Sequence, residues 1–143
     1  MATTPLTDEG KQLGDYLLYE GDRCYCRTAA LITNKAGEAI AAGELSIGYP
    51  LNLNGTTWET LDDAAESSCD GVLLEVVGEA IADDAVSVKK YSILRNGPAI
   101  VNLDATPVPV TGGAFDLAAL LTRLAALSPP IHVHREPTNQ EEL

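Results

Sequence analysis

Residues 70–103 read DGVLLEVVGEAIADDAVSVKKYSILRNGPAIVNL, and this stretch gives the clearest indication of the fold. Gly71–Val77 is apolar enough to form a strand that is buried on both faces. Ala85–Leu94 alternates apolar and polar positions, as a strand with one buried face does. Ala99–Leu103 is a third short apolar run, and the turn signal Arg95–Pro98 precedes it. The stretch therefore predicts three strands of a sheet.

Upstream of this stretch, the chain shows further strand and turn signals. Arg23–Asn34 (RCYCRTAALITN) is a strand candidate, and Glu44–Leu53 (ELSIGYPLNL) alternates apolar and polar residues. Pro50 inside the second run indicates an edge or a break, because proline cannot donate a ladder hydrogen bond. Asn54-Gly55 is the strongest hairpin signal in the chain, and we expect Trp58 to pack on that hairpin.

Downstream, the sequence predicts a single helix over residues 114–127 (AFDLAALLTRLAAL), which is rich in the strong helix formers Ala and Leu. Asp116 and Arg123 form a narrow polar stripe, and leucines cover most of the remaining surface. Such a wide apolar surface predicts burial, either against the sheet or against another subunit. Ser128-Pro129-Pro130 ends the helix, and residues 131–135 (IHVHR) form a last short strand.

Many short strands at intervals of about 8–12 residues, followed by one late helix, indicate a mainly β domain with one C-terminal helix, of the α+β class. We expect a small β-barrel or sandwich rather than a doubly wound sheet, because strands do not alternate with long helices. The organisation predicted is a flexible N-terminal arm over residues 1–14, one β-rich domain over 15–135 and a polar tail over 136–143.

The composition narrows the classes of partner. The 143 residues suit one domain, and the formal net charge of −12 argues against nucleic acid and anionic membranes as partners. No apolar run approaches the roughly 18 residues that span a bilayer. The first ten residues are polar and show no signal peptide, and three cysteines suit a reducing compartment. We therefore expect synthesis in the cytoplasm of the host cell.

Few residue constellations point to chemistry. A zinc site built from Cys24, Cys26, Cys69, His132 and His134 is disfavoured, because the spacings typical of structural zinc are missing. No nucleophile elbow or phosphate-binding glycine loop is present, and the acidic pairs 62–63 and 83–84 read as solvated turns. We therefore expect no catalysis, no metal and no cofactor.

The same central stretch resembles the head decoration proteins of tailed phages. The matching features are Asp70-Gly71 before an apolar strand, an acidic alanine-rich turn, an alternating strand and then L-R-x-G-P-A-x-V-N. The most specific part is Ser92–Asn102, and the likeness extends over roughly Asp15–Arg135, including the late helix and the following I-x-V strand. The longer carboxyl-terminal part and the paired cysteines differ from the best-known member of the family.

The resemblance implies a compact β-rich, tulip-like domain that forms a homotrimer at three-fold sites on the capsid exterior. It also implies an N-terminal arm that contacts the major capsid protein, and within that arm we predict contacts from Thr4, Pro5, Leu6 and Thr7. The resemblance implies a function without catalysis and without a cofactor. Two alternatives stay open, namely a fibre or tail component with a β-barrel, and a cupin-like barrel that binds a metal or small molecule.

Overall fold

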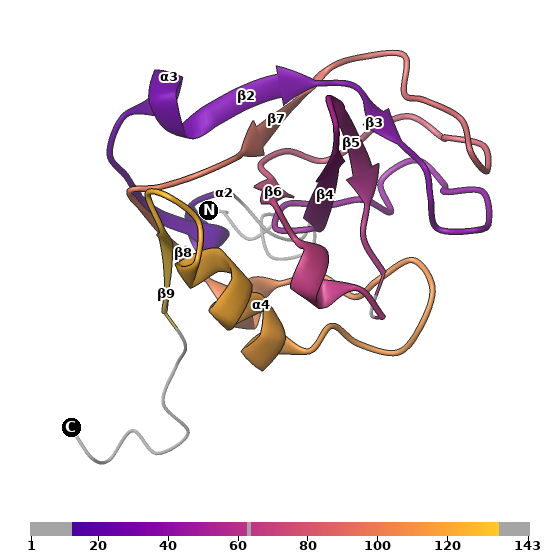
Figure 1. The fold of residues 1–143 in the computed structure, drawn as a ribbon. Helices are drawn as coiled ribbons and strands as arrows, with labels where there is room; N and C mark the ends of the chain where they lie inside the picture. Colours follow the sequence, from indigo (N-terminus) through magenta and orange to yellow (C-terminus); the bar gives the residue numbers. More distant parts are fainter. Residues whose placement is uncertain (1–12, 63, 135–143) are drawn as a thin grey trace, which may run out of the picture.

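The computed structural model describes residues 13–62 and 64–134, which form two β-sheets and several short helical segments (Figure 1). The smaller sheet has the strand order β1 (Leu17–Glu20), β8 (Ala99–Asn102) and β9 (Ile131–His134). The larger sheet has the order β2 (Arg27–Ala30), β7 (Tyr91–Leu94), β6 (Gly71–Leu73), β4 (Pro50–Asn54), β5 (Thr57–Thr60) and β3 (Ile32–Thr33). The helical segments are α2 (Leu13–Tyr16), α3 (Arg23–Cys26), the 3-10 turns η1 (Glu66–Ser68) and η2 (Leu103–Ala105), and α4 (Leu117–Ala125).

One continuous segment supplies both outer strands of the larger sheet. β2 pairs antiparallel with β7, and two residues later β3 pairs parallel with β5. The two ends of the sheet therefore lie against the same segment, on either side of Leu31. The prediction of a mainly β domain with a late helix is confirmed, but the described strands form two sheets and no closed barrel.

The predicted strand Arg23–Asn34 is wrong over its first four residues, where the chain forms α3. The carboxylate of Asp22 accepts a hydrogen bond from the backbone nitrogen of Cys24 at 3.0 Å and caps this helical turn. Cys24 is therefore exposed while Cys26 is buried, so the two thiols do not share one face of a strand.

Two of the predicted strands in the central stretch are shorter than their patterns suggested. Only Gly71–Leu73 forms β6, and only Tyr91–Leu94 forms β7. Beyond β6, the nitrogen of Leu74 still donates to the carbonyl of Ser92 in β7 at 2.9 Å, but the nitrogen of Val77 donates to the carbonyl of Leu45, which lies in a loop, at 2.9 Å. Local alternation identified the buried Tyr91 and Ile93, but its prediction that Val86 and Val88 share a buried face is wrong, because both are exposed.

The hairpin is confirmed, with its turn one residue later than the Asn54-Gly55 signal. Asn54 pairs with Thr57, so Gly55 and Thr56 form the two-residue turn. Gly55 has a φ of 67°, which glycine adopts without steric cost. Trp58 is buried opposite Leu53 on this hairpin, as predicted. Pro50 begins β4, a position where its missing N–H is tolerated.

Helix α4 begins at Leu117 and not at residue 114, because Asp116 caps it by accepting from the nitrogens of Ala118 and Ala119, and it ends at Ala125 and not at residue 127. Leu120 and Leu124 are buried within the same chain, where α4 contacts β9 and η1 (Figure 1). The sequence left open whether this helix is buried against the sheet or against another subunit. Leu120 and Leu124 pack in the core of their own chain. The last strand, β9, confirms the prediction for residues 131–135 to within one residue.

A close backbone contact explains the glycine of the L-R-x-G-P-A motif. A side chain at Gly97 would overlap the carbonyl group of Pro130, and the Gly97 nitrogen donates to the carbonyl of Pro129 at 2.9 Å. The turn between β7 and β8 is therefore locked against the segment that leads into β9. The turn itself leads from the larger sheet to the smaller one, because β7 belongs to the first and β8 to the second.

Candidate docking surface

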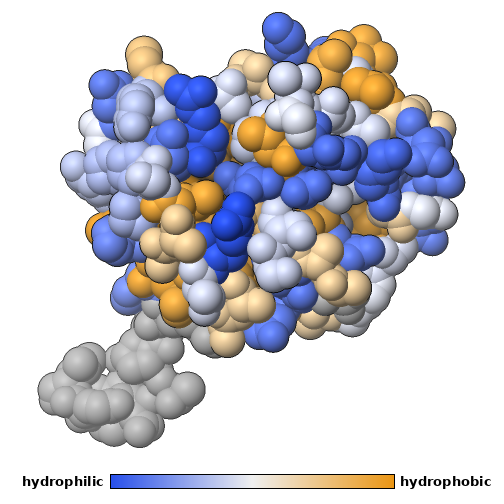
Figure 2. All heavy atoms as spheres, in the orientation of Figure 1, coloured by the Kyte–Doolittle hydropathy of each residue, from blue (hydrophilic) through white to orange (hydrophobic). Residues whose placement is uncertain are grey.

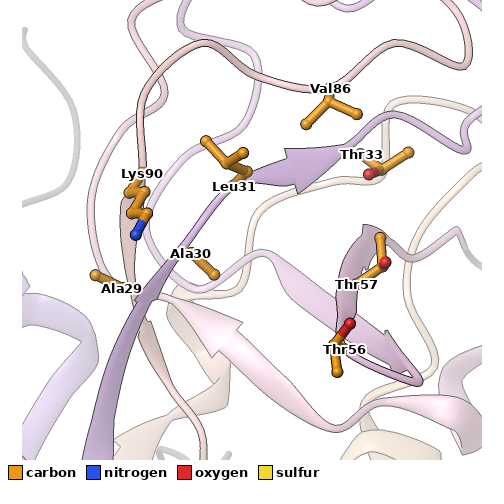
Figure 3. Close-up of a pocket in the computed structure, with 8 residues that line it drawn as sticks. All are labelled: Ala29, Ala30, Leu31, Thr33, Thr56, Thr57, Val86 and Lys90. Carbon is orange, nitrogen blue, oxygen red and sulfur yellow. The ribbon is translucent and has the colours of Figure 1, made fainter.

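A groove lies between the β2–β3 segment and the tip of the β4–β5 hairpin (Figure 3). Its volume is about 350 Å³, and alanines, threonines and two larger aliphatic side chains make up most of its lining. We call it the β2–hairpin groove, and its lining residues are Ala29, Ala30, Leu31, Thr33, Thr56, Thr57, Val86 and Lys90.

The groove exists because two strand pairings diverge at Leu31. Before this residue the chain pairs with β7, ending at Ala30 opposite Tyr91. After it, the chain pairs with β5, beginning at Ile32 opposite Trp58. The hairpin tip at Thr56 projects beyond the second pairing, so a wedge stays open between the tip and β2.

The loop before β7 borders the groove and exposes two valines. Ser87 is buried and anchors this loop, since its hydroxyl accepts from the nitrogen of Ile32 at 2.9 Å and donates to the carbonyl of Lys89 at 2.7 Å. On either side of it, Val86 is 51% exposed and Val88 is 87% exposed. Figure 2 shows hydrophobic side chains gathered at the upper right of the molecule, where Figure 1 places this loop.

The carboxylate of Glu79 holds the same loop from the outside. It accepts hydrogen bonds from the nitrogen of Val88 at 2.8 Å, the nitrogen of Lys89 at 3.1 Å and the hydroxyl of Tyr91 at 2.7 Å. These bonds hold the backbone of the loop that carries the exposed Val88 side chain. We call Glu79 and its three donors the Glu79 clamp.

The clamp shifts the pKa values of both of its titratable members. The backbone hydrogen bond from Val88, the Tyr91 hydroxyl and the Lys89 nitrogen all lower the pKa of Glu79 from its ordinary value. Burial and the neighbouring Glu79 carboxylate raise the pKa of Tyr91 to about 12. At neutral pH, Glu79 is therefore ionised and Tyr91 is protonated, which is the pairing that the clamp requires.

Two lysines lie beside the groove, close to the Glu79 carboxylate. Lys90 is the single charged residue in the groove lining, and within the described chain it forms no ion pair. Lys89 and Lys90 are both exposed, in a protein that carries 21 acidic and 9 basic residues. The surface thus combines aliphatic side chains with a border of mixed charge, made of Lys89, Lys90 and Glu79.

The structure describes only some of the residues that the sequence analysis singled out. Thr4, Pro5, Leu6 and Thr7 lie outside the described residues. His132 and His134 are exposed on β9, and burial raises the pKa of the Cys69 thiol to about 12. Among residues 13–62 and 64–134, no cluster of His, Cys, Asp or Glu is arranged to hold a metal ion. None of the helices in that part of the chain could span a membrane.

Sequence reasoning missed the groove because its lining comes from three separate segments. Its one local signal was the run Val86–Lys90, where two valines alternate and two lysines follow. That pattern was interpreted as one face of a strand, but Val86 and Val88 both face solvent, beside the buried Ser87. The pairing of Thr33 with Val86 and the hydrogen bonds between Ile32 and Ser87 bring this loop to the β2–β3 segment.

Comparison with known proteins gives no relative for this chain, since no family model, no curated protein and no solved structure matches it. The fold class therefore rests on the structure, and the function has to be argued from the residues.

Proposed function

We propose that this protein is a capsid decoration protein of a tailed phage. It binds the exterior of the assembled head at three-fold sites as a homotrimer, contacts the major capsid protein and stabilises the shell against the pressure of the packaged DNA. The observation that carries the proposal is the resemblance of residues 70–103, and above all of Ser92–Asn102, to that family. A mainly β domain with a late helix is compatible with the family's fold.

The most specific motif supports the proposal through the fold rather than through a binding surface. Its residues span β7, the Gly97 turn and β8, where they are engaged in joining the two sheets. Contacts with the shell therefore come from elsewhere. We assign them to the N-terminal arm, including Thr4, Pro5, Leu6 and Thr7, and to exposed surfaces of the domain.

The stabilising effect follows from linkage. A protein that binds the assembled shell better than separated subunits shifts the equilibrium toward the shell in proportion to that difference in affinity. Several weak contacts from one oligomer add through multivalency, so no single contact has to be strong. Ordering an arm on its partner costs several kcal/mol of the gross interaction energy, which favours binding only where the full site is present.

Co-sedimentation with expanded heads that lack decoration protein tests the proposal. We expect the full chain to pellet with these heads, to bind immature heads more weakly and to raise the temperature at which filled heads lose DNA. Leu6→Asp, which places a charge in the predicted arm contact, should weaken uptake without changing the folded domain. Heads that take up no protein, or that release DNA at the same temperature with it bound, would show that the proposal is wrong.

A further inference from the structure

We infer that the outer edge of strand β2 binds an extended peptide segment of another protein as an added strand. An acidic side chain of that segment lies in one groove beside the edge, and an aliphatic side chain lies in another. The inference does not depend on the proposed capsid function. It rests on the backbone groups of Ala29, on the two grooves and on the charge of Arg95.

Strand β2 turns hydrogen-bonding groups of its backbone away from β7. The nitrogen of Arg95 donates to the carbonyl of Cys26 at 2.8 Å, so these two residues form a hydrogen-bonded pair of the ladder. Bonded and non-bonded pairs alternate along an antiparallel ladder. In the register of these strands, Thr28 and Ala30 therefore bond to β7, whereas the N–H and C=O of Ala29 point to the other side.

The residue opposite Ala29 gives the same alternation. It is Ser92, whose carbonyl accepts from the nitrogen of Leu74 at 2.9 Å, on the side of β7 that faces away from β2. Within residues 13–62 and 64–134, no backbone group outside the β2–β7 ladder bonds to Ala29. An edge with such groups can accept an added strand, and the main-chain hydrogen bonds then supply part of the affinity.

Two grooves lie beside this edge, on opposite faces of the sheet. Ala29 and Thr57 line the β2–hairpin groove, whereas the residues next to them, Thr28 and Trp58, line a second groove of about 440 Å³. Successive side chains of a strand point to opposite faces, so each face has one of the grooves. Thr56 lines both, and Figure 3 shows it across the gap from Ala29.

A strand added along β2 would place alternate side chains in the two grooves. A side chain opposite Ala29 shares its face of the sheet and enters the β2–hairpin groove. The next side chain, opposite Thr28, enters the second groove. Pockets for alternate side chains are the means by which sheet edges of this kind recognise a sequence.

The second groove favours a carboxylate. Arg95 is exposed in its lining, donates from Nε to the carbonyl of Tyr25 at 3.2 Å and forms no ion pair within the described chain. Asp70, the other charged residue of the lining, already binds Arg123 at 2.6 Å and the nitrogen of Leu53 at 2.7 Å. One cation is therefore left for the partner, and a glutamate is complementary to it.

The β2–hairpin groove favours an uncharged side chain. Lys90 is the one charged residue of its lining, and Lys89 follows the exposed valines beside it. The carboxylate of Glu79 bonds to the nitrogen of Lys89, and that of Glu75 bonds to the backbone of β7. Two lysines and two glutamates leave this border without net charge. The aliphatic lining then decides, and a β-branched side chain such as valine fits it.

The net charge of −12 does not prevent one acidic side chain from binding. Screening at physiological salt limits the repulsion from distant carboxylates to roughly 8 Å, so the charges nearest the contact decide. In the second groove, the nearest charge without an ion-pair partner in the described chain is that of Arg95.

An NMR titration of the isotope-labelled full chain with the peptide acetyl-Thr-Val-Glu-Val-Thr-amide tests the inference. With its glutamate opposite Thr28, this peptide places valine opposite Ala29 in either chain direction. We expect saturable shifts at Ala29 and Thr56 and slower hydrogen exchange at the Ala29 amide, because that N–H gains an acceptor. The amides of Thr28 and Ala30 should change little in exchange rate, since they already bond to β7.

Variants test the two parts of the contact separately. Arg95→Glu should weaken peptide binding about tenfold, because like charges then meet in the second groove. Arg23→Glu, at an exposed arginine that lines neither groove, is the matched control. Ala29→Pro removes the outward N–H without removing a bond to β7 and should abolish binding. Circular dichroism shows whether each variant keeps the fold, and Arg95→Glu decides if Ala29→Pro does not.

Three results would overturn the inference. The first is a peptide that shifts no amide of β2 at millimolar concentration. The second is equal binding by Arg95→Glu and Arg23→Glu. The third is an Ala29 amide that is already protected in the free protein, because another part of the chain or a second copy would then fill the edge. Uptake by heads is a separate measurement, and none of these results changes what it tests.

Discussion

The guanidinium group of Arg123 donates to the carboxylate of Asp70 at 2.6 Å, which ties α4 to the larger sheet. The other Asp70 oxygen accepts from the nitrogen of Leu53 in β4 at 2.7 Å, and the Nε of Arg123 donates to the carbonyl of Cys69 at 2.6 Å. One carboxylate therefore bridges the helix and a strand. The Asp70 that opens the family-like motif thus has a structural partner more than fifty residues away.

Arg123→Met should lower the free energy of unfolding by about 1.5–3 kcal/mol, because it removes charge-assisted hydrogen bonds and leaves a partly buried Asp70 without its cation. Urea unfolding at pH 7 measures the change. Lys35→Met is the control, since the exposed Lys35–Asp84 pair at 3.3 Å should contribute less than about 1 kcal/mol. Equal effects of the two substitutions would contradict the bridging role of Asp70.

Leu120→Ala should destabilise the protein by about 2–5 kcal/mol, because a side chain that is 1% exposed leaves a cavity when truncated. Leu121→Ala, at the neighbouring position that is 37% exposed, should cost less than about 1 kcal/mol. Thermal unfolding of both variants tests whether α4 packs within its own chain. A mild Leu120→Ala phenotype would place the helix outside the core.

The sequence predicted elements whose determinants are local. The Asn54-Gly55 hairpin, strand β8 and helix α4 each carry their own turn, alternation or capping residues, and all three are present in the structure. Strand lengths were predicted poorly, because a strand ends where its neighbour ends. Val77 is buried, as its apolar run predicts, yet its backbone bonds to a loop rather than to a strand.

The β2–hairpin groove could not be predicted from the sequence either, because its lining comes from segments that are far apart in the chain. Nothing near Leu31 in the chain indicates that two ladders diverge there, because the partners Tyr91 and Trp58 belong to other segments. The capping of α3 by Asp22 was, in contrast, readable as a local signal. The prediction of one strand over Arg23–Asn34 does not take this signal into account, and it is wrong over the four residues that form α3.

Gly97→Ala should prevent stable folding or destabilise the protein severely, because the added methyl group would overlap the backbone of Pro130. Gly113→Ala is the matched control, since a side chain there meets nothing within 4 Å and its φ is not positive. The yield of folded protein and the unfolding midpoint of the two variants give the comparison. A Gly97→Ala protein as stable as Gly113→Ala would show that the motif's glycine has another role.

The Glu79 clamp should weaken in acid. Its hydrogen bonds lower the pKa of Glu79 in the folded state below the ordinary value of 4.5, so the folded protein binds the proton less readily than the unfolded chain. The stabilisation is therefore complete above about pH 4.5 and is lost as the pH falls through the lowered pKa. Amide exchange at Val88 and Lys89 should accelerate over that range, relative to the intrinsic exchange rate at each pH.

Glu79→Gln tests this pH dependence directly. The variant keeps an oxygen that accepts hydrogen bonds but cannot titrate, so Val88 and Lys89 should be less protected than in the wild type at pH 7 and should show little further loss in acid. Tyr91→Phe removes one donor and leaves the carboxylate titratable, so its protection should keep the acid dependence. If wild-type protection at Val88 and Lys89 stays constant from pH 7 to pH 3, the carboxylate does not hold the loop.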